Sequence, residues 1–268
     1  MGVLNFIPVE LRGIFPFKSH FFTTKEKHKV HYVDEGKGPV VVMLHGNPTW
    51  SFYYRDLIKT LRTNYRVICP DHLGCGLSDN PGKEYYHLQN RIEVIEELLS
   101  ELDIENFSLI VHDWGGAIGM GVAVNNPQMV NRIVYLNTAA FLSKEIPWRI
   151  MIGKFPFLGL ILIKGFNFFV RLALVMAPYK RLPEKVKKGY LYPYRKFNER
   201  EAVYQFVKDI PLWKGHRSFH VLENIDNKLN DLKCPKLFCW GAKDFCFHLG
   251  FLERWKKIYP DAKYCVYK

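Results

Sequence analysis

The stretch SLIVHDWGGAIGMG, residues 108–121, joins two different kinds of sequence. Its first half is an apolar, β-branched run typical of a buried strand, and its second half is rich in Gly and Ala, which lets a helix pack closely against a sheet. A sharp turn between two such halves is a nucleophile elbow, which displays the residue at the turn. Asp113 stands at this turn, where a hydroxyl or a thiol is the more familiar group. The stretch therefore predicts an α/β sheet that carries a carboxylate at one edge.

Strand-like and helix-like segments alternate on both sides of this stretch. The strand-like segments cover residues 28–36, 39–46, 65–72, 107–113, 131–139, 235–244 and 262–268. The helix-like segments cover residues 50–63, 88–104, 114–126 and 249–260. This order predicts an α/β protein with a mostly parallel sheet wound with helices.

Residues 142–232 interrupt the alternation, because they are helix-like, aromatic and basic and contain no clear strand. We therefore expect three parts: a first part of the core at 1–141, a helical cap or lid at 142–232, and a second part of the core at 233–268. Residues 155–178 are strongly apolar, but Lys164 and Arg171 interrupt them before a run of about 18 residues, the length of a membrane span, is reached. Packing within the lid, or the lining of a substrate tunnel, is the favoured interpretation.

The net charge of +12 is concentrated in this lid. Residues 143–215 hold 15 Lys and Arg against 5 Asp and Glu, a difference of +10. No nucleic-acid-binding motif accompanies the charge, so a solvated surface is favoured, with peripheral contact to a membrane or to an acidic protein as the alternative. The six cysteines show no CxxC spacing and the first residues do not resemble a signal peptide, which predicts a reduced, cytoplasmic protein without a metal site.

A carboxylate at an elbow suits one particular chemistry. It is ionised near neutral pH and can displace a leaving group from a saturated carbon, whereas a hydroxyl suits attack on an acyl carbonyl. The product is an ester of the protein itself, and water must then attack the carbonyl of that ester. An aspartate that only caps the following helix is the structural alternative.

Two neighbouring residues offer neutral hydrogen-bond donors to a departing anion. Residues 45–55, HGNPTWSFYYR, follow a buried strand, where this architecture places the second loop of its oxyanion hole. Asn47 offers a side-chain amide, and Trp114 offers an indole N–H beside Asp113. Taken alone, Asn47 would suit a turn and Trp114 a core. Their joint position predicts that they stabilise a leaving group.

Four motifs in this order and spacing resemble those of the haloalkane dehalogenases of the α/β-hydrolase fold: HGNPTW (45–50), PDHLGCGLSD (70–79), VHDWGG (111–116) and WGAKDF (240–245). The resemblance covers nearly the whole chain. It implies that Asp113 is the nucleophile, that Asn47 and Trp114 are the halide-stabilising pair, and that Asp244 is the acid that orients a catalytic histidine. It also implies a small apolar alkyl substrate and no cofactor.

Two further segments, LNTAAF (136–141) and REAVYQFVKDIPL (200–212), look most like one branch of this family. That branch includes the β-lactone decarboxylases of bacterial long-chain olefin synthesis, and the motifs do not separate the two activities. The alkyl C–O bond of a lactone is another electrophile for Asp113. Epoxide hydrolases are a further alternative, since they polarise the epoxide oxygen with lid tyrosines. The candidates for that role are Tyr179, Tyr190, Tyr192, Tyr194 and Tyr204.

Hydrolysis of the ester needs a histidine that activates water, and in this fold it follows the last strand. The sequence has no histidine beyond His248 and stops at Lys268, so we expect a core that ends before the catalytic histidine and lacks the C-terminal helix. His45, His112, His216 and His220 are not expected to replace it. Two hypotheses follow: an enzyme that stalls at the ester, or a catalytically silent pseudoenzyme that binds apolar ligands or a partner through its basic lid.

Overall fold

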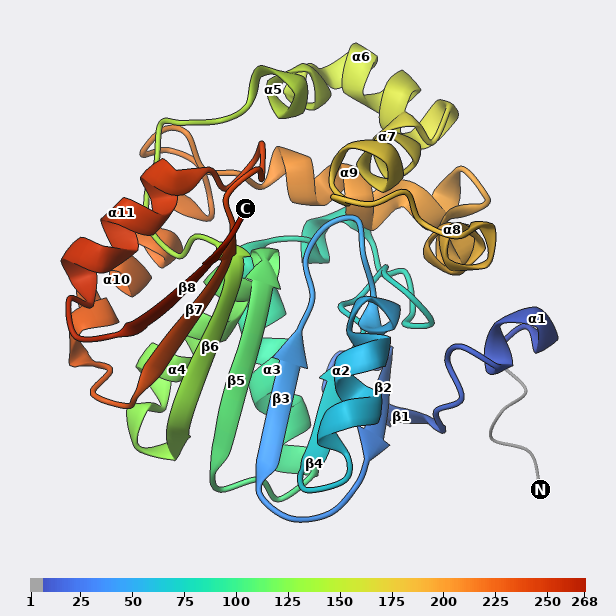
Figure 1. The fold of residues 1–268 in the computed structure, drawn as a ribbon. Helices are drawn as coiled ribbons and strands as arrows, with labels where there is room; N and C mark the ends of the chain where they lie inside the picture. The colour runs from blue at the N-terminus through green and yellow to red at the C-terminus, as the bar shows by residue number, and fades with distance from the viewer. Residues whose placement is uncertain (1–6) are drawn as a thin grey trace.

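The computed structural model describes residues 7–268 and is built on one eight-stranded sheet with the strand order β1-β2-β4-β3-β5-β6-β7-β8 (Figure 1). The strands are β1 (Ser19–Thr23), β2 (Lys29–Glu35), β3 (Val40–Leu44), β4 (Arg66–Pro70), β5 (Phe107–Asp113), β6 (Val130–Thr138), β7 (Lys236–Gly241) and β8 (Lys263–Tyr267). Strand β2 pairs antiparallel with both β1 and β4, and the pairs from β4 to β8 are all parallel. The carboxyl ends of the six strands β3 to β8 therefore meet at one edge.

Alternation along the central strands produces two cores, one on each face of the sheet. Val42 and Leu44 of β3 point to the face that helices α3 (Leu88–Glu101) and α4 (Trp114–Asn125) cover. Val41 and Met43 point to the opposite face, where α2 (Arg55–Leu61) packs. Because both faces are buried, the strand is apolar along its whole length, as the sequence indicates.

The remaining helices lie outside this central layer. They are α1 (Val9–Arg12), α5 (Trp148–Lys154), α6 (Pro156–Gly159), α7 (Phe168–Met176), α8 (Glu184–Leu191), α9 (Glu201–Lys208), α10 (Phe219–Lys228) and α11 (Leu249–Ile258). A π-helical turn (Leu160–Gly165) continues α6. Helices α5 to α9 lie above the carboxyl edge of the sheet, at the top of Figure 1.

Residues 142–232, all of them described, contain helices and turns but no strand, as expected for the lid. Helix α10 lies near α11 at the side of the sheet rather than above it (Figure 1). Its Leu222 and Ile225 join the same apolar core as α3 and α4. The spacing of three residues places both side chains on one helix face, which packs on the sheet layer. The boundaries of the lid at 142 and 232 stay a prediction.

No single helix in the described part of the chain is long and apolar enough to cross a membrane. One pair of helical segments, Phe157–Gly165 and Phe168–Met176, is long and apolar enough when taken together. The two segments are bent by 70° relative to each other.

Each segment that the sequence predicts as a strand or a helix of the core is present, with small shifts at the ends. Strand β1 and helix α1 were not predicted. In β1 only Ser19 and Phe22 are buried, a spacing of three, so the period-2 signal of a strand is absent. The expected fold class, an α/β-hydrolase sheet, is confirmed.

Candidate active site

Asp113 lies at the sharp turn between β5 and α4, with φ 50° and ψ −126°. A positive φ is unfavourable for any residue with a Cβ, and such strain is found at functional turns. The turn is tight on both sides. A Cβ on Gly46 would stand 2.2 Å from Asp113 Oδ1, and a Cβ on Gly115 would stand 2.0 Å from the carbonyl oxygen of Leu44. Gly46 therefore lets the loop after β3 approach the carboxylate, and Gly115 lets the first turn of α4 pack on the end of β3.

The carboxylate of Asp113 is held by backbone groups. The N–H of Asn47 donates to Oδ1 at 2.7 Å, and the N–H of Trp114 also donates to the carboxylate. Burial raises the pKa of Asp113 to about 7, although these two hydrogen bonds lower it, and the nearby charge of Asp244 raises it further. Asp113 occupies the N-cap position of α4, but its side chain makes no capping hydrogen bond. The N–H of α4 that reaches the carboxylate is that of its first residue, Trp114, whereas an N-cap side chain bonds to the second or third N–H of its helix.

The side chains of Asn47 and Trp114 are both fixed by helix α9 of the lid. Asn47 Nδ2 donates to the carbonyl oxygen of Val203 at 3.2 Å, which leaves the second hydrogen of that NH₂ group for another acceptor. The ring of Trp114 packs on Phe206, with 5.4 Å between the ring centroids. Both residues contact Asp113 through their backbone N–H groups, which the sequence argument had not singled out.

Asp244 lies in the loop after β7, at the same edge of the sheet. Its Oδ1 accepts hydrogen bonds from the N–H groups of Cys246 and Phe247, at 2.8 and 2.9 Å. Burial raises the pKa of Asp244, and the two N–H groups oppose that rise. Because its charge raises the pKa of Asp113, the two carboxylates share one electrostatic environment.

Asn137, at the end of β6, was missed by the sequence argument. Its Nδ2 donates to the carbonyl oxygens of Gly241 and Phe247, at 3.0 and 3.3 Å, and its Oδ1 accepts the N–H of Gly241 at 2.8 Å. It therefore fastens the loop of Asp244 to the strand beside β5. The sequence offered one signal, the place of Asn137 in the LNTAAF motif, and that signal is not specific. The unusual φ of 28° is more specific, but it is known only from the structure.

Two further groups near the carboxylates were also missed. Burial raises the pKa of Cys246 and of Tyr53, and the charges of Asp113 and Asp244 contribute to both rises. Both groups are therefore kept neutral, as a thiol and as a phenol, beside the two carboxylates.

All ten histidines fall within the described residues, and none of them is hydrogen-bonded to Asp113 or Asp244. His112 stacks on the ring of Tyr53 at 4.4 Å, and burial lowers its pKa to about 3. His248 faces Glu145 at 3.0 Å.

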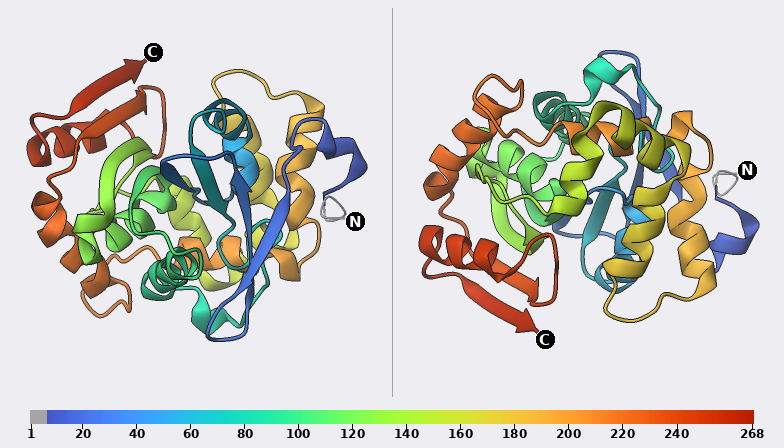
Figure 2. Two further views of the ribbon diagram at one scale, coloured as in Figure 1. Left: turned by 90° about the horizontal axis from the view of Figure 1, so that it is seen from below. Right: turned by 90° about the horizontal axis from the view of Figure 1, so that it is seen from above.

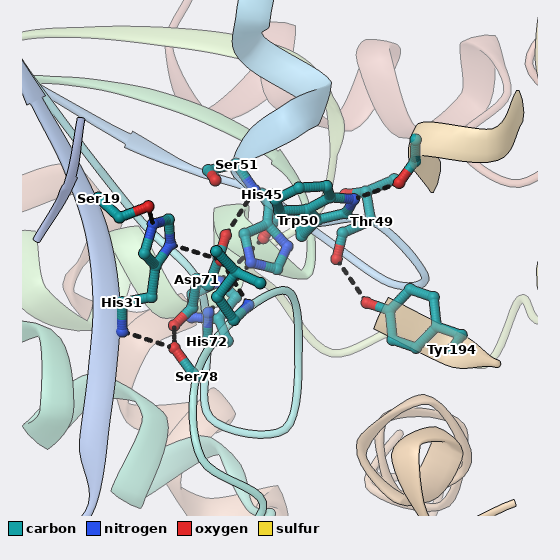
Figure 3. A network of polar contacts seen from close by, with 12 residues as sticks. Ser19, His31, His45, Thr49, Trp50, Ser51, Asp71, His72, Ser78 and Tyr194 are labelled. Carbon is teal, nitrogen blue, oxygen red and sulfur yellow. Dashed lines mark hydrogen bonds and ion pairs between the residues drawn. The ribbon is translucent and has the colours of Figure 1, made fainter. Parts of the chain in front are cut away.

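A buried polar network supports the loop that carries Asn47 (Figure 3). Asp71 accepts hydrogen bonds from the N–H of Ser51 at 2.7 Å and from the N–H of Leu77 at 2.9 Å, and it pairs with His31 Nδ1 at 2.7 Å. Burial alone would raise the pKa of Asp71, but the charge and hydrogen bond of His31 hold it below its ordinary value. The network joins β2, the loop after β4 and the loop after β3. It therefore sets the position of residues 45–51.

Three of the five lid tyrosines are either hydrogen-bonded to residues outside the elbow or exposed. Tyr190 accepts a hydrogen bond from Arg55, and Tyr194 donates to the carbonyl oxygen of Thr49. Tyr179 is exposed at the surface. Among the described residues there is also no group of three or more His, Cys, Asp or Glu side chains that could hold a metal ion.

Comparison with known proteins agrees with this geometry. A family model described as the alpha/beta hydrolase fold matches residues 39–268. A cis-3-alkyl-4-alkyloxetan-2-one decarboxylase from Shewanella oneidensis is 42% identical over 262 residues, which cover 94% of this chain and 82% of that protein. Haloalkane dehalogenase 2 from Mycobacterium tuberculosis is 33% identical over 256 residues, or 92% of this chain and 86% of that protein.

Solved structures of haloalkane dehalogenases share the fold. DbeA from Bradyrhizobium elkani superposes with a TM-score of 0.83 at 21% identity, over 93% of this chain and 88% of that one. DatA from Agrobacterium tumefaciens superposes with a TM-score of 0.81 at 24% identity, over 93% and 87% of the two chains. The protein therefore belongs to the α/β-hydrolase fold family, and within it is a haloalkane dehalogenase-like enzyme whose curated relatives also include β-lactone decarboxylases.

Proposed function

We propose that Asp113 attacks a saturated carbon of an apolar alkyl substrate and displaces its leaving group. The observation that carries the proposal is that a backbone N–H group binds the carboxylate of Asp113 at the strained turn between β5 and α4. Oδ1 accepts the N–H of Asn47, and Oδ2 is proposed as the oxygen that attacks. A lone pair of Oδ2 forms the new C–O bond while the carbon–halogen bond breaks, and the halide leaves with that electron pair. The indole N–H of Trp114 and the second amide hydrogen of Asn47 are the donors proposed to receive it.

Release by hydrolysis requires water to attack the ester carbonyl of Asp113. The negative charge then develops on the carbonyl oxygen of the ester, Oδ1, to which the N–H of Asn47 already donates. Asp244 is proposed to orient the histidine that would activate this water. Since no histidine among residues 7–268 is bonded to either carboxylate, we expect this step to be slow in the 268-residue chain.

Decarboxylation of a β-lactone is the second candidate, favoured by the 42% identity to an oxetanone decarboxylase. Here Asp113 attacks the saturated ring carbon that is bonded to the ring oxygen, and this C–O bond breaks. The opened product is an ester of Asp113 with a carboxylate on the neighbouring carbon. Loss of CO₂ supplies the electron pair of a new C=C bond and expels the carboxylate of Asp113. This route regenerates the nucleophile without water, so it does not need the histidine.

To distinguish the two activities, the same protein is incubated separately with a bromoalkane and with a β-lactone, and the products are measured. With 1-bromobutane we expect one equivalent of bromide per chain and a butyl adduct at Asp113 that persists in intact-mass spectra. With a cis-3,4-dialkyloxetan-2-one, decarboxylation predicts repeated formation of alkene. The proposal is contradicted if the chain forms no adduct and no product with either compound. Release of many equivalents of bromide per chain would show that the ester is hydrolysed. The nucleophilic role of Asp113 would then stand, and only the expectation of slow hydrolysis would be wrong.

The pKa of Asp113 gives a prediction for pH. Only the carboxylate attacks, and its pKa is raised to about 7. The single-turnover rate of alkylation should therefore rise about tenfold per pH unit below this value and level off above it. The bromide released in the first turnover, measured from about pH 5 to about pH 9, checks this. In Asp244→Asn the profile should move to lower pH, because the neighbouring charge that raises the pKa is removed. A flat profile would exclude Asp113 as the titrating group.

A further inference from the structure

We propose that the outer surface of helices α6 and α7 binds the surface of an anionic lipid bilayer. We call this surface the lid face and define it by the outward apolar side chains Phe157, Ile161, Phe166, Phe168 and Val175. Helix α6 lies at the top of Figure 1, on the side of the lid away from the sheet, and the ribbon of residues 156–176 is in front in the view from above (Figure 2). The proposal does not depend on the chemistry of Asp113, so either proposal can fail without the other.

The two sides of these helices differ in what covers them. Ile163 and Val170 point inward and pack with Val203 of α9 in a small core of the lid. The outward side chains are left to solvent: Phe157 is 83% exposed, Val175 is 75% exposed and Phe166 is 69% exposed. Soluble surfaces seldom gather this many large apolar side chains in one place, and such a patch indicates an interaction site.

Charge identifies a lipid surface as the occupant. Between residues 146 and 183 the sequence contains six Lys or Arg and no Asp or Glu. Arg171, Lys180 and Arg181 of this stretch are exposed. In α7 the exposed Phe168, Arg171 and Val175 follow one another at spacings of three and four, so a cation stands within the apolar stripe. Apolar side chains interleaved with Lys and Arg are typical of segments that lie in the interface of anionic membranes.

The geometry favours a helix pair that lies on the membrane over one that spans it. Each of the two helical segments, Phe157–Gly165 and Phe168–Met176, is about 13 Å long, far short of the roughly 30 Å of a hydrocarbon core. The bend of 70° between them prevents their use as one straight span. Placed flat, both segments can bury their outer side chains at the level of the lipid headgroups.

A second copy of the chain is a poorer occupant. In a two-fold contact the same face meets itself, so the cations of one lid would lie against those of the other, with no acidic residue from 146 to 183 to pair with them. Together the two helices are as long and as apolar as a membrane segment, which a surface built for an acidic protein does not need.

Flotation of the 268-residue chain with vesicles tests the proposal. One set of vesicles contains phosphatidylcholine only, and the other contains about one third phosphatidylglycerol. We expect binding to the anionic vesicles, weakened as NaCl is raised from about 0.05 M to about 0.5 M. The double variant Phe157→Glu, Val175→Glu should bind at least about tenfold more weakly. The triple variant Arg171→Gln, Lys180→Gln, Arg181→Gln should lose most of the preference for anionic vesicles.

The matched control is Leu57→Glu with Val266→Glu. These residues are 39% and 46% exposed, and they belong to α2 and β8, away from the lid face. The control should bind vesicles as the unchanged chain does. The proposal is overturned if the chain floats with neither set of vesicles, or if the control loses binding as much as the lid variant. It is also overturned if the lid variant changes only the oligomeric state, measured by light scattering, because the face would then serve self-association.

Discussion

Asp113→Asn should lower the rate of adduct formation with 1-bromobutane at least about a thousandfold, which corresponds to roughly 4 kcal/mol of activation free energy. The amide has nearly the shape of the carboxylate, and its oxygen can still accept the N–H of Asn47. It carries no negative charge, however, and is a far weaker nucleophile towards a saturated carbon. Intact-mass spectrometry after a fixed incubation measures the loss. Asp244→Asn serves as the control, since it should still form the adduct.

Unfolding cannot account for this loss of rate, because Asp113→Asn should be at least as stable as the unchanged protein. The pKa of Asp113 is raised from its ordinary value near 3.8 to about 7 in the folded chain. A carboxyl group with a raised pKa favours the folded state when protonated, and this contribution is lost as pH rises through that range. Above pH 7 the ionised Asp113 therefore destabilises the fold, and the neutral amide should raise the melting temperature. An adduct that forms at an unchanged rate would exclude Asp113 as the nucleophile.

Asp71→Ala should lower the free energy of unfolding by about 4 kcal/mol, a large share of the roughly 5–15 kcal/mol of a typical domain. The change removes one fully buried carboxylate and leaves the N–H groups of Ser51 and Leu77, and the ring of His31, without their acceptor. A buried donor without a partner costs about 1–3 kcal/mol. Urea denaturation measures the effect.

Asp79→Ala is the matched control, because Asp79 accepts a single backbone hydrogen bond, from the N–H of Lys29, at an exposed position. We expect it to cost less than about 1 kcal/mol. Asp71→Asn should fall between the two, since it keeps one oxygen as an acceptor. If Asp71→Ala were as stable as Asp79→Ala, the network of Figure 3 would not be what holds the loop of Asn47.

The structure also adds one contact to the sequence argument about that loop. The motif HGNPTW indicated a leaving-group donor in the side chain of Asn47. In the folded chain, it is the backbone N–H of Asn47 that reaches Asp113, while the side chain is bonded to Val203, 156 residues away along the chain. Asn137 was overlooked for the same reason, because its partners, Gly241 and Phe247, are more than 100 residues distant.

The sequence by itself determined the order of strands and helices, the elbow at Asp113 and the place of Asp244 after a strand. These features depend on period, turn chemistry and glycine, which act between residues close together in the chain. Only the tertiary structure decided which donors meet the carboxylate, that the pKa of Asp113 rises to about 7, and that the outer face of the lid stays apolar and exposed. Burial and the pairing of distant groups arise when separate segments pack against one another, so local pattern does not contain them.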